Sequence, residues 1–237
     1  MAGWTISLVM PAYNEAEAIV ESARDALQSL SRFAHDYEVI IVDDGSHDGT
    51  SDRLQSLNDR HLRVIRHAHN RGYGAALNTG FRAARFSRVA FTDADGQFYL
   101  DDLARLVSMS DQAPVVVGYR MDRQDPWQRR FYSWGYNVLV RSLLRTGVRD
   151  CDCALKVFHR DVLMELLPET QGFFVNAEML TRARRLGHTI REVGVRHRAR
   201  RQGVSKVAIS DVPRTLRVLI PYWWKHARTQ RSVTQPA

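Results

Sequence analysis

The first half of the chain alternates short apolar runs with longer stretches in which apolar residues recur at helical spacing. Short apolar runs are typical of buried strands, and here they cover residues 6–10, 37–42, 62–65 and 88–92. The helical spacing covers residues 15–30, 50–57 and 74–84. We expect the first strand to end at Pro11. The alternation of strand and helix predicts a parallel sheet with right-handed crossovers.

The second half carries the same two patterns less regularly. Strands are predicted at residues 115–118, across 148–160 and at 189–197, and helices at 129–144 and 175–186. The stretch 211–228 has the spacing of an amphipathic helix. We therefore expect a Rossmann-like, mostly parallel sheet flanked by helices. These elements predict a single α/β domain over residues 1–210, followed by an amphipathic C-terminal helix and tail over residues 211–237.

Polar loops follow three of the predicted strands, at residues 11–15, 43–49 and 93–98. In open α/β sheets, ligands bind beyond the carboxyl ends of the strands. These loops are therefore the first place to look for a functional site.

The segment Asp93-Ala-Asp-Gly-Gln97 places two carboxylates and an amide directly after the strand at 88–92. If the strand geometry continues, Asp93 and Asp95 point the same way and the amide oxygen of Gln97 is in reach. Three hard oxygen ligands suit a Mg²⁺ or Mn²⁺ ion that also holds phosphates. The alternative is an ordinary solvated turn, because Asp and Gly are common turn residues.

The net charge of +8 predicts an anionic partner. Nucleotide phosphates, an anionic lipid, a phospholipid surface or nucleic acid would each fit, and a basic surface without function is the alternative. The chain lacks an aromatic–basic RNA motif and a recognition helix, so we expect no nucleic-acid partner.

Cys151 and Cys153 are the only cysteines. A disulfide across one intervening residue would be strained, and two thiols cannot complete a zinc site. We therefore expect reduced, partly buried thiols in an intracellular protein. The sequence shows no secretory signal and no apolar stretch of the roughly 20 residues that a spanning helix needs. These features predict a cytoplasmic protein that can dock peripherally on the membrane.

Two further loops offer weaker signals. The segment 70–76 leads into a helix and could approach a phosphate, although a turn that starts a helix explains it equally well. The acidic segment 43–50 could accept hydrogen bonds from a ribose or a base. Its alternative is a turn with a helix cap, in which Asp48 and Thr50 supply the cap. Neither a dinucleotide-binding glycine motif nor a P-loop occurs.

Five segments in order carry a resemblance to a known family. They are Leu8-Val-Met-Pro-Ala-Tyr-Asn-Glu15, Ile40-Ile-Val-Asp-Asp-Gly-Ser-His-Asp-Gly-Thr50, Asn70-Arg-Gly-Tyr-Gly-Ala-Ala76, Asp93-Ala-Asp-Gly-Gln97 and Asp150-Cys-Asp-Cys-Ala-Leu-Lys156. Together they resemble family 2 glycosyltransferases with the GT-A fold. Within that family the chain is most similar to the dolichol-phosphate, or polyprenyl-phosphate, mannosyl- and glucosyltransferases.

The resemblance implies a donor site for a nucleotide-sugar. It implies that the nucleotide pocket is lined by Pro11, Tyr13, Glu15, Val42 and Asp44. Of these, Val42 and Asp44 would lie at the base and the ribose. Asp93, Asp95 and Gln97 would hold the metal that bridges the diphosphate, with Ala94 in the same donor site. Glu178 would face the donor sugar, or else be a solvated helix glutamate.

The resemblance also implies an acceptor site. Arg120, Arg129 and Ser133 would bind a lipid phosphate, and Arg200 and Lys206 would cover the diphosphate or the donor sugar. The alternatives are an exposed helix start at 129–133 and a solvated basic loop at 200–206. The residues implied for catalysis are Asp95, Arg129 and Asp150, with Asp152 as a substitute for Asp150.

The implied activity is a metal-dependent, inverting transfer of mannose or glucose from a GDP- or UDP-linked donor to a polyprenyl phosphate. One alternative is a soluble or glycan hydroxyl acceptor, and a remote one is a non-catalytic basic domain that binds nucleic acid. The mixed apolar, aromatic and basic tail at 211–228 predicts docking at a membrane surface, or else packing on the core. The sequence does not determine the donor base or the oligomeric state.

Overall fold

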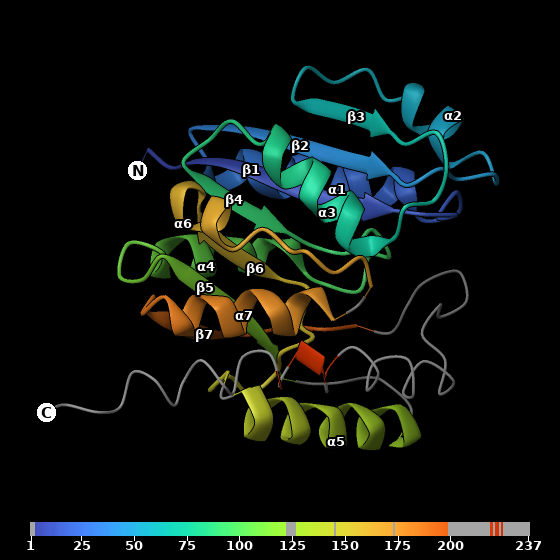
Figure 1. Cartoon of the computed structure of the whole chain (residues 1–237). Coiled ribbons are helices and arrows are strands. Elements are labelled where there is room, and N and C mark those ends of the chain that lie inside the picture. Colours follow the sequence, from blue (N-terminus) through green and yellow to red (C-terminus); the bar gives the residue numbers. More distant parts are fainter. Residues whose placement is uncertain are drawn as a thin grey trace, which may run out of the picture.

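The computed structural model describes residues 3–121, 127–144, 146–172 and 174–198, together with 219, 221, 222 and 224. The strand–helix alternation predicted for the first half is confirmed (Figure 1). Its elements are β1 (Thr5–Ala12), α1 (Ile19–Phe33), β2 (Asp36–Asp43), α2 (Thr50–Gln55), β3 (Leu62–Arg66), α3 (Tyr73–Ala83) and β4 (Arg88–Phe91).

The second half contains short helices that the apolar pattern did not predict, namely η1, α4 and α6. Its elements are η1 (Leu100–Asp102), α4 (Leu103–Met109), β5 (Val115–Arg120), α5 (Trp127–Leu144), β6 (Lys156–His159), α6 (Arg160–Glu165), α7 (Val175–Arg185) and β7 (Ile190–Val195). The prediction of a strand across 148–160 is wrong for most of that range, because β6 covers only its end. The residues before β6 form a loop whose polar groups bind α5, α7 and β5.

The seven strands form one sheet in the order β3-β2-β1-β4-β6-β5-β7. Strand β6 runs antiparallel to both of its neighbours, and the other neighbouring pairs are parallel. The prediction of a mostly parallel sheet is confirmed. In Figure 1, α3 and α7 lie in front of the sheet and α1 passes behind it, so helices cover both faces.

Strand β1 does not stop at Pro11 but runs on to Ala12. The carbonyl of Val9 accepts from Thr92, on the β4 side of β1, at 3.1 Å. Groups two residues apart along a strand face the same side, so the position of the missing Pro11 N–H also faces β4. The β1–β4 pairing ends at Val9 and Phe91. The proline therefore removes no hydrogen bond from the sheet, and the strand can continue.

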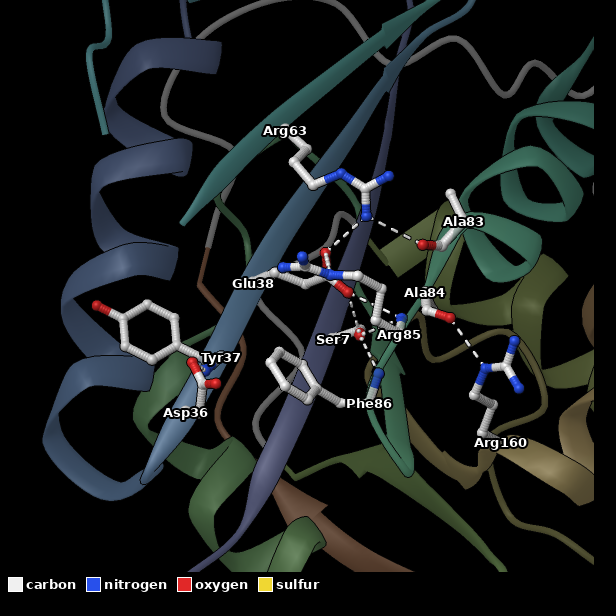
Figure 2. A network of polar contacts seen from close by, with 10 residues as sticks. All are labelled: Ser7, Asp36, Tyr37, Glu38, Arg63, Ala83, Ala84, Arg85, Phe86 and Arg160. Atoms are coloured by element: carbon white, nitrogen blue, oxygen red, sulfur yellow. Dashed lines mark hydrogen bonds and ion pairs between the residues drawn. The ribbon is translucent and has the colours of Figure 1, made fainter. Parts of the chain in front are cut away.

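A buried carboxylate organises the opposite, amino-terminal end of the sheet (Figure 2). Glu38, on β2, has no exposed surface and accepts from the Ser7 hydroxyl at 2.7 Å and from Arg63 at 2.7 Å. The backbone N–H and the Nε of Arg85 also donate to it, at 2.9 and 3.0 Å. Burial alone would raise the pKa of Glu38, but these donors outweigh it and lower the pKa below 4.5. The carboxylate thus links β1, β2 and β3 to the start of β4.

Most of the predicted C-terminal helix falls outside the described residues. Of the residues that are described, Leu219 is fully buried and the ring of Tyr222 packs edge-on against Phe174, with the ring centroids 5.1 Å apart. Trp224 is 54% exposed. These contacts favour packing on the core for this part of the tail, and membrane docking stays a prediction. Within the described part of the chain, no helix is both long and apolar enough to cross a membrane.

Candidate functional site

The carboxyl ends of β1, β2 and β4 meet at one edge of the sheet. Ala12 at the end of β1 pairs with Asp43 at the end of β2, and Val9 pairs with Phe91 at the end of β4. The loops that follow these strands are the three polar loops of the sequence. Their predicted meeting at one edge is confirmed.

Side chains of the loop after β2 fix the loop after β1. The backbone N–H groups of residues 14–16 donate in turn to Ser46 Oγ, Thr50 Oγ1 and Asp48 Oδ2, each at 2.9 Å. Asp48 also accepts from the N–H of Thr50, the first residue of α2, at 3.0 Å. Burial would raise the pKa of Asp48, but these donors lower it. Gly49 is the N-cap of α2, so the predicted capping role is wrong for both residues. Asp48 precedes the cap and accepts from the N–H of Thr50, whereas Thr50 is the first helical residue and binds the neighbouring loop.

Asp44 turns toward the protein. Its carboxylate is hydrogen-bonded with His67 Nδ1 at 2.6 Å and accepts from the backbone N–H groups of Arg71 at 3.0 Å and Gly72 at 2.8 Å. The Nε2 of His67 lies 3.0 Å from Thr79 Oγ1. Asp44 is 3% exposed. A ribose would have to compete with these partners, so the nucleotide contact predicted for Asp44 stays a prediction.

The other predicted nucleotide residues divide into buried and accessible groups. The side chain of Val42 has no exposed surface and faces α3, where a Cβ added at Gly80 would lie 3.2 Å from it. Pro11 is also buried, whereas Tyr13 and Glu15 are half-buried in the loop after β1. Of these four residues, only Tyr13 and Glu15 have accessible side chains. Their role in lining the nucleotide pocket stays a prediction.

The glycines at the start of α3 serve close packing. The N–H of Gly74 donates to the carbonyl of Gln171 at 2.8 Å, and the N–H of Gly72 donates to Asp44. A Cβ at position 74 would lie 2.1 Å from the Thr170 carbonyl oxygen. Neither N–H is left for a phosphate. The interpretation of residues 70–76 as a phosphate loop is therefore wrong at these two glycines, and the loop 168–172 covers the start of α3 instead.

The predicted metal residues lie in a turn, because β4 ends at Phe91, before Asp93 is reached. The expectation of continued strand geometry is wrong, and the turn alternative describes the backbone. The turn is fixed at several points. The Ser22 hydroxyl donates to the Ala94 carbonyl at 2.8 Å, and the Gln97 N–H donates to Asp95 at 3.1 Å. Asp93 and Asp95 stay partly accessible, while Gln97 is 8% exposed.

Tyr73, which the sequence reasoning missed, connects the start of α3 to this turn. Its hydroxyl donates to Asp93 Oδ1 at 2.9 Å. Burial raises the pKa of the Tyr73 phenol well above 10, and the charges of Asp93, Asp95 and Asp152 raise it further. The phenol therefore joins the start of α3 to the turn that carries Asp93. Its position between the two glycines of residues 70–76 was the only signal in the sequence.

Arg120 and Asp150, which are both predicted for the acceptor site, bind each other. The guanidinium Nε and Nη2 donate to the two carboxylate oxygens at 2.7 and 2.8 Å, and the side chains are only 9% and 10% exposed. Burial would lower the pKa of Arg120, but Asp150 outweighs it and raises the pKa. A carboxylate held this way is a poor proton acceptor. The structure thus argues against Asp150 as a general base.

The loop of residues 150–155 is built around a buried lysine that the sequence reasoning did not single out. Lys156 is 1% exposed, and its ammonium donates to the carbonyls of Cys151 and Cys153 and to Asn176 Oδ1. Burial lowers its pKa. Both cysteines are free, as predicted, but fully rather than partly buried. Burial raises the pKa of both thiols, that of Cys153 to about 12, so neither is a reactive nucleophile.

Glu178 is neither solvated nor directed at an open site. It is 1% exposed and accepts from the backbone N–H groups of Glu169 at 2.9 Å and Thr170 at 3.0 Å. The Thr170 hydroxyl adds a third bond at 2.6 Å. The alternative of a solvated helix glutamate is wrong. The side chain instead fixes the loop 168–172, which packs on the start of α3.

Several predicted phosphate ligands cannot be placed. Arg129 and Ser133 belong to α5, but their side chains fall outside the described part of the structure, as do Arg200 and Lys206 entirely. The chain just before Arg200 is described, and it lies on the turn of residues 93–97, which carries the predicted metal residues. The N–H of Arg198 donates to the Gln97 carbonyl at 2.9 Å, and its Nε donates to the Gly96 carbonyl at 2.6 Å.

The donor set at the turn fits a hard divalent cation. Among the described residues, no three His, Cys, Asp or Glu side chains form a complete metal cage. Mg²⁺ does not need one, because it is commonly held by one or two carboxylates together with substrate phosphates and water. Asp93 and Asp95 provide two accessible carboxylates, and Asp152 adds negative charge nearby. A cation here would relieve the repulsion among these groups.

Comparison with known proteins agrees with this arrangement. The sequence profile described as "Glycosyl transferase family 2" matches residues 7–167, which span β1 to α6 and both sides of the site. The chain belongs to glycosyl transferase family 2.

Relatives of this family 2 chain include the glycosyltransferase AglD of Haloferax volcanii, which is 34% identical over 98% of the chain and 40% of the relative. An undecaprenyl-phosphate 4-deoxy-4-formamido-L-arabinose transferase of Edwardsiella ictaluri is 32% identical over 86% of the chain and 63% of its own length. A dodecaprenyl-phosphate galacturonate synthase of Rhizobium johnstonii is 30% identical over 91% and 64%. The chain thus spans 40% to 64% of the length of these relatives.

Solved structures share the fold. Glucosyl-3-phosphoglycerate synthase of Mycobacterium tuberculosis, in complex with Mn²⁺, UDP and glucosyl-3-phosphoglycerate, matches with a TM-score of 0.72 and 25% identity. The match covers 92% of this family 2 chain and 78% of the synthase. The predicted GT-A class is therefore confirmed.

Proposed function

We propose that this chain is a metal-dependent glycosyltransferase that moves mannose or glucose from a GDP- or UDP-linked donor to a polyprenyl phosphate, with inversion. The observation that carries the proposal is the turn that presents the accessible carboxylates of Asp93 and Asp95, with Asp93 held by the Tyr73 hydroxyl, beside the fixed loops after β1 and β2. Two of the relatives are named as polyprenyl-phosphate sugar enzymes, which supports the acceptor. The Mn²⁺ and UDP in the synthase structure support a cation and a nucleotide.

On the donor side, Asp93 and Asp95 would hold the cation, with Gln97 beside them. When bound, the cation supplies positive charge that stabilises the departing diphosphate. Tyr13 and Glu15 border the nucleotide from a loop that the side chains of residues 43–50 keep in place. The pocket is therefore organised before the donor arrives, which lowers the entropy cost of binding.

On the acceptor side, a phosphate oxygen forms a bond to the anomeric carbon while the bond from that carbon to the diphosphate breaks. The electron pair of the broken bond leaves with the diphosphate. A phosphate is already ionised near neutral pH and needs no base, whereas a hydroxyl acceptor would need one. The pairing of Asp150 with Arg120 therefore favours the phosphate acceptor over the hydroxyl alternative.

Arg129 and Ser133 are proposed as phosphate ligands together with Arg120. Positions 129, 133 and 137 follow one another at intervals of four along α5, so they share one side of the helix. Asn137 accepts from the N–H of Cys151 at 2.8 Å, which connects this helix to the loop of residues 150–155. Arg200 and Lys206 follow Arg198, which is hydrogen-bonded to the turn of residues 93–97. We propose that they close over the diphosphate.

A transfer assay tests the proposal. UDP- and GDP-linked glucose and mannose are each incubated with undecaprenyl phosphate, undecaprenol or 3-phosphoglycerate, and the products are identified by mass. We expect a hexosyl lipid only with undecaprenyl phosphate and Mg²⁺ or Mn²⁺, and none after chelation. Transfer to undecaprenol or 3-phosphoglycerate instead would refute the acceptor assignment.

The metal residues are tested in the same assay with Asp95→Ala. We expect turnover to fall at least about a hundredfold, because a bound cation contributes several kcal/mol to stabilisation of the transition state. Asp101→Asn is the matched control, since Asp101 is a half-exposed partner of Arg32 and is not among the residues proposed to hold the cation. A folded Asp95→Ala variant with wild-type turnover would remove the metal assignment.

A further inference from the structure

Tyr73 is a polar side chain at the site to which the proposed function assigns no task in the reaction. It is the first residue of α3, packs partly buried against the apolar core, and donates its hydroxyl hydrogen to Asp93 Oδ1 at 2.9 Å. Asp93 is one of the two carboxylates proposed to hold the cation. The phenol is therefore in direct contact with a metal-ligand candidate, from a segment far away in the sequence.

We propose that Tyr73 is a positioning residue that holds the Asp93 carboxylate in the orientation required to bind the divalent cation. This inference rests on the proposed function. A hydrogen bond to one oxygen fixes the rotation of a carboxylate, and with it the directions of the lone pairs that a metal can use. Partners of this kind, which touch the ligand rather than the metal, typically tune metal affinity by about 10- to 100-fold.

The position of Tyr73 is itself fixed on both sides along the chain. The N–H of the preceding Gly72 donates to Asp44 at 2.8 Å, and the N–H of the following Gly74 donates to the Gln171 carbonyl at 2.8 Å. The ring packs against the core between these two anchors. Its contact with Asp93 is thus supported by hydrogen bonds on both sides along the chain.

The two anchors depend on buried carboxylates. Asp44 holds the segment before Tyr73 directly, and Glu178 fixes residues 169 and 170 of the loop that holds the segment after it. The resemblance to known transferases implied ligand contacts for both residues. The structure assigns them a common task as supports for Tyr73, and through Tyr73 for the metal carboxylate.

The test is the affinity of Tyr73→Phe for Mn²⁺, measured from the paramagnetic resonance signal of free Mn²⁺ in the presence of UDP and, separately, of GDP. We expect about tenfold weaker Mn²⁺ binding, while nucleotide affinity in chelator stays within about twofold because the nucleotide loops are untouched. Tyr37→Phe is the matched control. It removes the same phenol oxygen from the amino-terminal end of β2, where Tyr37 stacks on His61.

The outcomes separate the two proposals. Wild-type protein that shows no metal-dependent nucleotide binding would overturn the proposed function and this inference with it. Wild-type binding together with unchanged Mn²⁺ affinity in Tyr73→Phe would overturn the positioning role alone.

A second variant covers the case in which Tyr73→Phe fails to fold, as judged by circular dichroism. Site-specific 4-fluorophenylalanine at position 73 fills nearly the volume of tyrosine but has no hydroxyl hydrogen to donate to Asp93. We expect it to weaken Mn²⁺ binding by about tenfold, as in Tyr73→Phe. Unchanged affinity in the fluorinated protein would overturn the positioning role.

Discussion

Glu178 illustrates what single residues contribute at this site. The helix α7 buries a carboxylate whose oxygens accept three donors from residues 169 and 170, and Arg182 adds a contact at 3.3 Å. A buried carboxylate is tolerated only where donors surround it. Burial removes the Glu178 carboxylate from water, and the hydrogen bonds that it accepts fix a loop that forms neither helix nor strand.

Replacing Glu178 with Gln should destabilise the protein. The amide keeps the shape of the side chain but turns an N–H₂ group toward backbone N–H donors, so at least one buried donor loses its acceptor. We expect the free energy of unfolding to fall by about 2 kcal/mol, measured by urea denaturation. Glu165→Gln is the control, because the Glu165 side chain is 54% exposed beside His188. Equal stabilities for the two variants would contradict the structural role of Glu178.

The contacts of Glu178 also show where sequence reasoning stops at the residue scale. The pattern predicted a helix at 175–186 and a glutamate within it, and both are present. It could not predict the partners, because a loop 8 or 9 residues away supplies them only after chain folding. The same holds for Tyr73 and Asp93, and for Lys156 and Asn176. Such pairings depend on three-dimensional register, which a local pattern of residue types does not encode.

At the scale of elements, the start of α3 and the loop 168–172 act as one unit. Apolar periodicity and strand ends were enough to predict β1 to β4 and to place the polar loops at one edge. The close approach of a second loop to α3 was not predictable, because the glycines that permit it also fit a phosphate loop. The structure decides between a phosphate loop and a packed helix start, because the N–H groups of Gly72 and Gly74 already donate to Asp44 and to the Gln171 carbonyl.

Gly74→Ala tests this unit. The added methyl group would lie 2.1 Å from the Thr170 carbonyl oxygen, so helix and loop must separate. We expect a loss of about 1–3 kcal/mol in unfolding free energy, as in overpacked cores, and weaker Mn²⁺ binding because Tyr73 moves with the helix start. Gly172→Ala is the control in the same loop, since its methyl group would meet nothing within 4 Å. Similar losses in both variants would show that the loop is merely sensitive to substitution.

At the scale of the whole molecule, the two ends of the sheet have different tasks. The carboxyl end gathers partly accessible carboxylates that a cation would neutralise. The amino end buries its carboxylate, Glu38, and neutralises it internally with Arg63 and Arg85 (Figure 2). Polar groups that are satisfied within the protein add stability, whereas groups kept available for ligands cost stability until the ligand binds.

This division predicts how stability depends on pH. The pKa of Glu38 is lower in the folded protein than its usual 4.5. Its contribution is therefore fully present above pH 4.5 and is lost as the pH falls through the lower folded value. Glu38→Gln should lower the unfolding free energy by about 2 kcal/mol near neutral pH, because the buried side chain loses its charge-assisted hydrogen bonds with Arg63 and Arg85. The difference from wild type should shrink on acidification below 4.5.

Urea denaturation between about pH 3 and about pH 7 measures this difference. Glu17→Gln, at an exposed position, should follow the wild-type curve throughout. A deficit in Glu38→Gln that stays constant over the whole range would mean that the variant loses packing rather than charge. A deficit that fades in acid would show that the charge of Glu38 is what stabilises this end of the sheet. Because that end lies opposite the proposed metal site, we expect Asp95→Ala to keep the stabilising contribution of Glu38.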